Sequence, residues 1–170
     1  MRAFAALLLR APRSAAWCLV LAWCCMITWF SSQPGAARPS TWIWSVLSNG
    51  AHAPEFGLLA AWTSLLVARR DGWPDLRPAA RLAIIATILV LGIGDEWHQS
   101  FTPGRDVSVF DLLTDVVGAT VTLEIAAYLG REGATRVGVA ARFVVAAGAA
   151  FACGALATFV PRCFPDIAWF

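Results

Sequence analysis

The chain has 170 residues, of which 59% are hydrophobic and only 14% are charged, and its mean hydropathy is +0.66. This composition excludes a water-soluble globule of this size and is typical of a polytopic membrane protein, for which we expect no nucleic-acid partner. The formal charge is +2, and all 13 basic residues are arginines. No polar block is long enough to fold by itself, so we expect residues 1–170 to form a single integral membrane domain.

Five apolar segments predict an all-α membrane protein, a compact bundle of about five transmembrane helices. The predicted spans are about 14–31, 53–68, 79–94, 109–129 and 137–160. The first span follows a basic segment and has two interpretations. It is either a retained helix, as its bulky indoles favour, or a cleavable signal peptide. Residues 32–51, rich in Ser, Pro and Gly, predict an amphipathic outer loop that lies on the membrane, with the Trp42 and Trp44 indoles at headgroup level.

The arginines predict the orientation of the bundle. Arg38, Arg105 and Arg162 fall on one side of the predicted spans, and the other ten of the 13 fall on the opposite side. Arginine-rich loops stay in the cytoplasm, according to the positive-inside rule. We therefore expect a multi-pass protein of the bacterial cytoplasmic (inner) membrane, with a cytoplasmic N-terminus and an extracytoplasmic C-terminus.

Ionisable side chains gather between the third and fourth spans and at the start of the second. An ionisable group at the centre of a membrane helix costs roughly 2.5–3.5 kcal/mol, so such groups indicate a functional site. Asp111 and Asp115 are one helical turn apart and share a face, as do His52 and Glu55. The predicted functional polar cluster comprises His52, Glu55, Asp95, Glu96, His98, Gln99, Arg105, Asp111 and Asp115.

The carboxylates of this region, Asp106 included, outnumber its cations, so the sequence predicts a resident cation or proton. The planar fork of Arg105 suits a carboxylate. We therefore expect it to pair with at least one of Asp95, Glu96, Asp111 and Asp115, while the other acids, with His52 and Glu55, line an outward pocket. The alternative is a purely structural network of salt bridges that closes a helical hairpin.

The chain resembles the VanZ-like family of small bacterial membrane proteins over about residues 15–130. The stronger block runs from Asp95 to Arg105, followed by Asp111, Asp115 and Gly118, and is similar to the family's DE-x-x-Q, PGR, D and G pattern. The weaker block is His52 with Glu55. The helix at about 137–160 is additional to this core. The resemblance implies a role in glycopeptide or teicoplanin resistance in the cell envelope.

Three functions stay open from the sequence. The first is a non-enzymatic protein whose polar site binds a lipid-linked envelope component or an amphiphilic glycopeptide. The second is a membrane-embedded enzyme acting on a lipid-linked substrate, with unknown catalytic residues. No cofactor is predicted firmly, but a divalent metal would find candidate ligands in His52, Glu55, Glu96 and His98. The third is a scaffold that binds another membrane protein through the small-residue faces of the last two spans.

Overall fold

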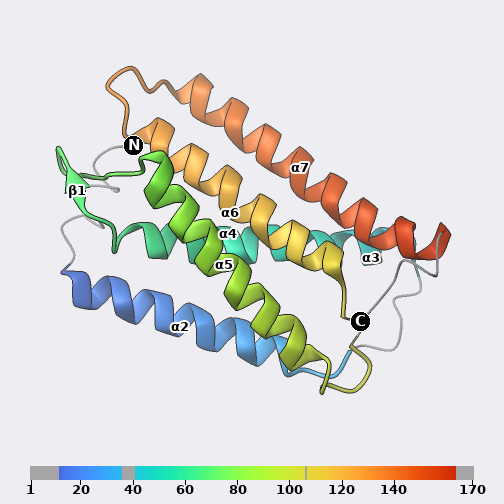
Figure 1. The fold of residues 1–170 in the computed structure, drawn as a ribbon. Coiled ribbons are helices and arrows are strands. Elements are labelled where there is room, and N and C mark those ends of the chain that lie inside the picture. The colour runs from blue at the N-terminus through green and yellow to red at the C-terminus, as the bar shows by residue number, and fades with distance from the viewer. Residues whose placement is uncertain (1–11, 36–40, 106, 164–170) are drawn as a thin grey trace.

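The computed structural model describes residues 12–35, 41–105 and 107–163, so most of the predicted basic N-terminal segment and Asp106 lie outside the described residues. The elements in chain order are α2 (Arg13–Ser31), α3 (Trp42–Gly50), α4 (His52–Ser64), β1 (Arg69–Arg70), β2 (Trp73–Pro74), α5 (Pro78–Gln99), α6 (Val109–Leu129) and α7 (Arg136–Cys163) (Figure 1). The two short strands pair antiparallel within one loop. The predicted all-α membrane bundle is confirmed, because α2, α5, α6 and α7 are each long and apolar enough to cross a bilayer.

Helix α4 is shorter than a membrane span, and a second helix continues its path. Its 13 residues rise about 20 Å, against a hydrocarbon core of about 30 Å. Only Ala51 separates α4 from α3, and Ala51 itself has right-handed helical dihedrals, φ −67° and ψ −24°. Pro54 has no N–H to offer the carbonyl of Gly50, which interrupts the helix at this point.

The structure corrects two sequence-based boundaries. Residues 42–50, predicted as part of a loop, form α3, which begins at an N-cap where the Thr41 hydroxyl accepts a hydrogen bond from the Trp44 N–H at 3.4 Å. Helix α5, predicted to end near residue 94, continues to Gln99. Polarity rises at Asp95, but no residue that breaks a helix occurs before Pro103. Asp95, Glu96 and His98 therefore lie on a helix and not in a turn.

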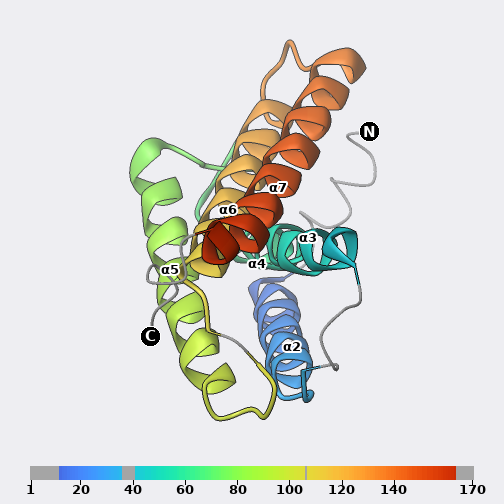
Figure 2. The same cartoon turned by 90° about the vertical axis from the view of Figure 1, so that its right-hand side faces the viewer.

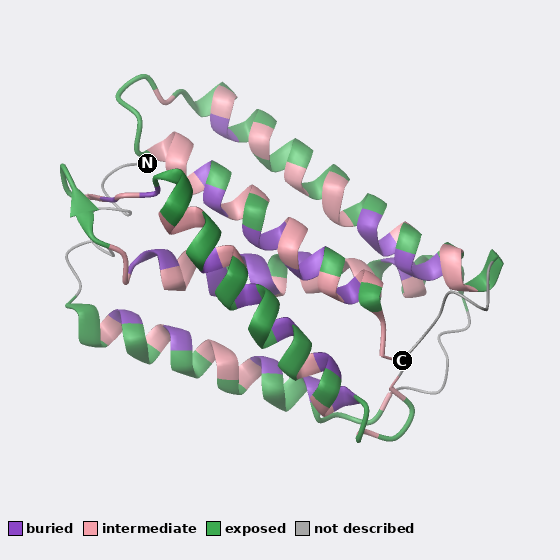
Figure 3. Ribbon diagram, in the orientation of Figure 1, coloured by how far each residue is buried: buried purple, intermediate pink, exposed green. Residues whose placement is uncertain are grey.

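Helix α4 occupies the middle of the bundle. Figure 2 looks nearly along α3 and α4 and shows α2, α5 and α6 arranged around α4, with α7 beyond α6. The apolar core joins Phe56 and Leu59 of α4 to Ile88 of α5 and Leu123 of α6. The outward faces of α5 and α7 are exposed along their length (Figure 3), and Leu82 and Val144 are 68% and 72% exposed. These apolar faces are suited to contact with lipid.

Small residues bring helices into backbone contact. A Cβ added at Gly118 of α6 would overlap the Ala53 carbonyl of α4, and one added at Gly154 of α7 would overlap the Val46 carbonyl of α3. The small-residue faces of α6 and α7, which suggested a binding surface for another membrane protein, are at these positions packed against helices of the same chain. Helix α7 is fixed to α3 further by the Asn49 amide, which donates to the Thr158 hydroxyl at 3.2 Å.

Candidate functional site

Two aspartates near the start of α6 form the floor of the candidate site. Ser108 caps this helix, and its hydroxyl accepts a hydrogen bond from the Phe110 N–H at 3.2 Å. Asp111 and Asp115 follow on one face, only 6% and 1% exposed. One turn further along the same face, Gly118 allows α4 to approach. The close crossing of α4 and α6 therefore brings the first residue of α4 to these carboxylates.

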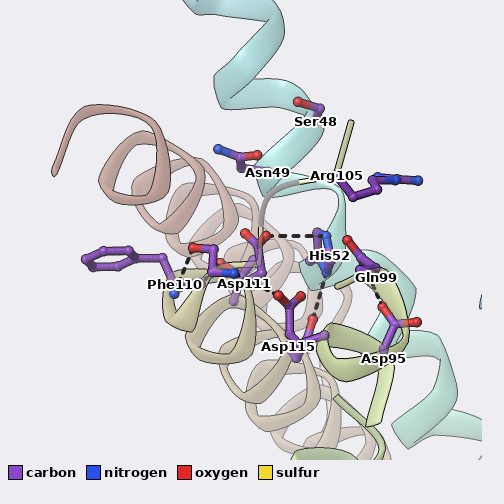
Figure 4. Close-up of polar contacts among 12 residues, drawn as sticks. Ser48, Asn49, His52, Asp95, Gln99, Arg105, Phe110, Asp111 and Asp115 are labelled. Carbon is purple, nitrogen blue, oxygen red and sulfur yellow. Dashed lines mark hydrogen bonds and ion pairs between the residues drawn. The ribbon is translucent and has the colours of Figure 1, made fainter. Parts of the chain in front are cut away.

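That first residue is His52, and its ring lies between the two carboxylates (Figure 4). Its Nδ1 is 3.2 Å from Asp115 Oδ1, and its Nε2 is 3.9 Å from Asp111 Oδ2. The ring also stacks on Phe56, one turn along α4, with 6.3 Å between centroids. His52 is thus held by a short contact on one nitrogen and a longer one on the other, and 14% of its side chain stays exposed.

Helix α5 contributes the third carboxylate. Glu96 is 4% exposed, and its Oε2 accepts a hydrogen bond from the Ser108 N–H at 2.8 Å, which fastens the end of α5 to the start of α6. One turn earlier, Gly92 leaves room for Asp115, because a Cβ there would lie 2.7 Å from Asp115 Oδ2. Asp115 is therefore enclosed between α5 and α4.

Each of these three carboxylates keeps one buried oxygen without a hydrogen-bond partner. Within the described residues these oxygens are Glu96 Oε1, Asp111 Oδ1 and Asp115 Oδ2. Buried polar atoms are normally paired, and leaving one unpaired costs about 1–3 kcal/mol, or more when the group is charged. We call the group of His52, Glu96, Asp111 and Asp115 the inner cluster. It contains three carboxylates and one imidazole, so its acidic groups outnumber its basic group.

The prediction that Arg105 pairs with a carboxylate is wrong. Its Nε donates to the Gln33 carbonyl at 3.1 Å and its Nη2 to the Phe30 carbonyl at 2.6 Å. Both carbonyls lie where α2 ends. A cation at a helix C-terminus can donate to the terminal carbonyls, and its charge interacts favourably with the helix dipole. Gly104, with φ +76°, lies against the backbone of Gly35 in the same loop contact.

The other predicted residues lie around the inner cluster. Asp95 accepts a hydrogen bond from the Gln99 amide at 2.7 Å, within one turn of α5. His98 faces α2, where its Nε2 is 2.9 Å from the Ser32 hydroxyl. Glu55 is half-buried one turn after His52, and its backbone carbonyl accepts a hydrogen bond from the Trp23 indole at 2.9 Å. These residues connect α2, α4 and α5 at the same end of the bundle.

The two histidines among the candidate metal ligands have different partners. His52 is engaged by Asp115, whereas His98 contacts Ser32, the residue that follows α2. Across the described ranges, no three His, Cys, Asp or Glu side chains are arranged to hold a metal ion. A divalent metal at this site stays a prediction.

Sequence reasoning missed Gly92 and Ser108. A signal for Ser108 was present, because Ser followed three residues later by Asp, before an apolar run, is typical of a helix N-terminus. Gly92 carried a weaker signal, a helical glycine one turn before two acids. Its function of making room for a carboxylate from another helix appears only in the assembled bundle.

Comparisons with known proteins support the family resemblance. Neither the curated proteins nor the solved structures contain a significant match to this chain. The sequence profile of the VanZ/LLP1 family matches residues 16–130, a stretch that holds every residue of the predicted polar cluster and stops before α7. This match extends over more than half of the chain, which therefore belongs to the VanZ/LLP1 family.

Proposed function

We propose that this protein acts in the bacterial cell envelope by binding an amphiphilic envelope component or glycopeptide at the inner cluster, and that it lowers susceptibility to teicoplanin-type antibiotics. The observation that carries the proposal is the set of three buried, unpartnered carboxylate oxygens around one histidine. Burying unpaired charge is expensive, and a ligand with complementary charge would offset that cost. Family membership supports a membrane role.

The proposed orientation places this site near the outer surface of the membrane. The loops at 65–77 and 130–135 lie at one end of the bundle and contain the arginines Arg69, Arg70, Arg77 and Arg131 (Figure 1). The positive-inside rule assigns that end to the cytoplasm. The inner cluster lies toward the opposite end, and Asp115, the seventh residue of α6, is about 9 Å along the axis from the first. An amphiphile in the outer leaflet would meet it just below the headgroups.

Antibiotic susceptibility tests the proposal. Expression of the chain in a sensitive host is expected to raise the inhibitory concentration of a lipoglycopeptide, and Asp115→Asn is expected to cancel the rise. Asp71→Asn is the matched control, because Asp71 is fully exposed in the turn between the strands and has φ +53°, which asparagine tolerates. A wild-type chain that leaves susceptibility unchanged would refute the resistance function.

A second candidate, acid–base catalysis on a lipid-linked substrate, is favoured by one contact. His52 Nδ1 lies 3.2 Å from Asp115 Oδ1. A carboxylate in this position orients an imidazole so that its other nitrogen can accept a proton from an attacking water. Extracted envelope lipids incubated with purified protein would lose an ester or phosphate group, and His52→Gln would abolish that loss. Lipid that stays unchanged with the wild type would exclude this candidate.

A further inference from the structure

The inner cluster offers three acceptors that the chain itself leaves unused. Glu96, Asp111 and Asp115 are each more than nine-tenths buried, at 4%, 6% and 1% exposed. Each has one oxygen engaged, by the Ser108 N–H or the His52 ring, and one oxygen free of any partner among the described residues. The ligand that suits them is a donor of several hydrogen bonds and not an acceptor.

The basic side chains near the inner cluster do not supply hydrogen-bond donors to these three oxygens. The sequence contains no lysine, and Arg105, the arginine in the polar run itself, donates to the Phe30 and Gln33 carbonyls. In the described part of the chain, the ion pairs of Asp111 and Asp115 are with His52 alone. A single imidazole carries at most one positive charge against three carboxylates. The imbalance is relieved either by a proton on a carboxylate or by a cation that the chain does not supply.

The chemistry of the acceptors selects the kind of cation. A primary ammonium group carries a positive charge and three N–H donors, so it can donate to more than one carboxylate oxygen without the close convergence of ligands that a metal needs. A quaternary ammonium group has the same charge but no N–H. A divalent metal requires convergent ligands at about 2.0–2.6 Å, an arrangement that the described residues do not provide.

The exposed edge of the inner cluster lies at an end of the bundle that also carries exposed aromatic side chains. Part of the His52 and Asp111 side chains is exposed, 14% and 9%. Trp97 and Phe101, at the same end of the bundle, are 69% and 70% exposed, which suits apolar chains and the membrane interface. A ligand with an apolar tail can therefore remain in the bilayer while its polar end reaches the carboxylates.

We infer that the inner cluster binds the primary ammonium group of a membrane-dissolved amphiphile, which donates hydrogen bonds to the unpartnered carboxylate oxygens, Asp111 Oδ1 and Asp115 Oδ2 above all. This inference rests on the proposed function and names the ligand class of the same site. The amine belongs to a lipid-like molecule, because the outer faces of the bundle that holds the site are apolar and four of its helices are long enough to cross a membrane.

Calorimetric titration of the purified full chain in nonionic detergent tests the inference. The probes are decylamine, decyltrimethylammonium, decanol and methylammonium. Decylamine is expected to bind at least tenfold more tightly than the other three, a difference of about 1.4 kcal/mol. Asp115→Asn and Asp111→Asn are expected to weaken decylamine binding at least tenfold. Asp71→Asn changes the net charge equally at an exposed site and is expected to bind as the wild type does.

The outcomes separate the inference from the resistance function. Equal binding of decylamine and decyltrimethylammonium, or equal binding by all three aspartate variants, would overturn the ammonium site. Methylammonium that binds as tightly as decylamine would overturn the amphiphile. Asp111→Asn removes a 3.9 Å contact only, so it keeps the test valid if Asp115→Asn fails to fold. Decylamine binding without any effect on antibiotic susceptibility would refute the proposed function and leave the ammonium site standing.

Discussion

Replacement of Gly92 by alanine tests the packing that encloses Asp115. The new Cβ would lie 2.7 Å from Asp115 Oδ2, closer than a methyl group can approach, and 3.2 Å from Leu112 Cδ2, which is a tight contact. Either α5 and α6 move apart, or the Asp115 carboxylate turns away from His52. Gly94→Ala is the matched control, because it lies two residues away in the same helix and a Cβ there has no neighbour within 4 Å.

The two responses have similar costs. Overpacking a tight interior costs about 1–3 kcal/mol, and losing a hydrogen bond to a charged group costs about 1.5–3 kcal/mol. Both variants gain the helix propensity of alanine over glycine, about 1 kcal/mol, so this gain cancels in the comparison. We expect Gly92→Ala to be less stable than Gly94→Ala by about 1–3 kcal/mol.

Thermal unfolding of the two purified variants in the same detergent measures the difference. At about 2–4 °C per kcal/mol for a chain of this size, Gly92→Ala is expected to melt from a few degrees to about 10 °C below Gly94→Ala. Gly92→Ala is also expected to lose resistance in the susceptibility assay, whereas Gly94→Ala retains it. Equal melting temperatures would mean that Asp115 is not confined by α5, and the argument for an enclosed carboxylate would fail.

Three further predictions concern the frame of the site. Arg105→Lys keeps the charge but lacks the planar fork with which the guanidinium bridges two carbonyls. We therefore expect both Arg105→Lys and Arg105→Ala to melt at a lower temperature, with a loss of about 1–3 kcal/mol in the free energy of unfolding. A lysine variant as stable as the wild type would contradict this. Gly118→Ala is expected to abolish folded protein in size-exclusion chromatography, because the methyl group overlaps the α4 backbone, whereas Gly148→Ala, which meets open space, is expected to elute as the wild type does. A cytoplasmic reporter fused after Arg131 is expected to be active, and activity of an extracytoplasmic reporter there would reverse the proposed orientation.

The sequence was informative where an apolar run and a helix have the same ends. The fourth predicted span, 109–129, coincides with α6, because the apolar run begins and ends where Ser108 and Gly130 cap the helix. The end of α5 was not predictable in the same way. Hydropathy falls at Asp95, but helix formation depends on backbone hydrogen bonds, which continue until Pro103 approaches. Composition therefore marks where a helix leaves the apolar region and not where the helix ends.

The candidate site was also predictable only in part. Helical periodicity placed Asp111 and Asp115 on one face, and the structure brings His52 to both. The partner of Arg105 was hidden, because the carbonyls of Phe30 and Gln33 are backbone groups that every residue carries. Only the ending of α2 beside the Arg105 loop makes those carbonyls accessible to a donor from another segment. That the nine polar residues act as a functional site stays a prediction.

The backbone contact between α4 and α6 has a mechanical consequence. At Gly118 the α6 backbone lies directly against the Ala53 backbone of α4, with no side chain between them, and at Gly57 the small Thr122 hydroxyl would lie only 2.6 Å from an added Cβ. We therefore expect the two helices to move as one rigid body, to which His52, Asp111 and Asp115 are all attached. If the site opens to admit a ligand, we expect α5, which carries Glu96, or α3, which precedes Ala51, to move relative to the fixed pair of α4 and α6.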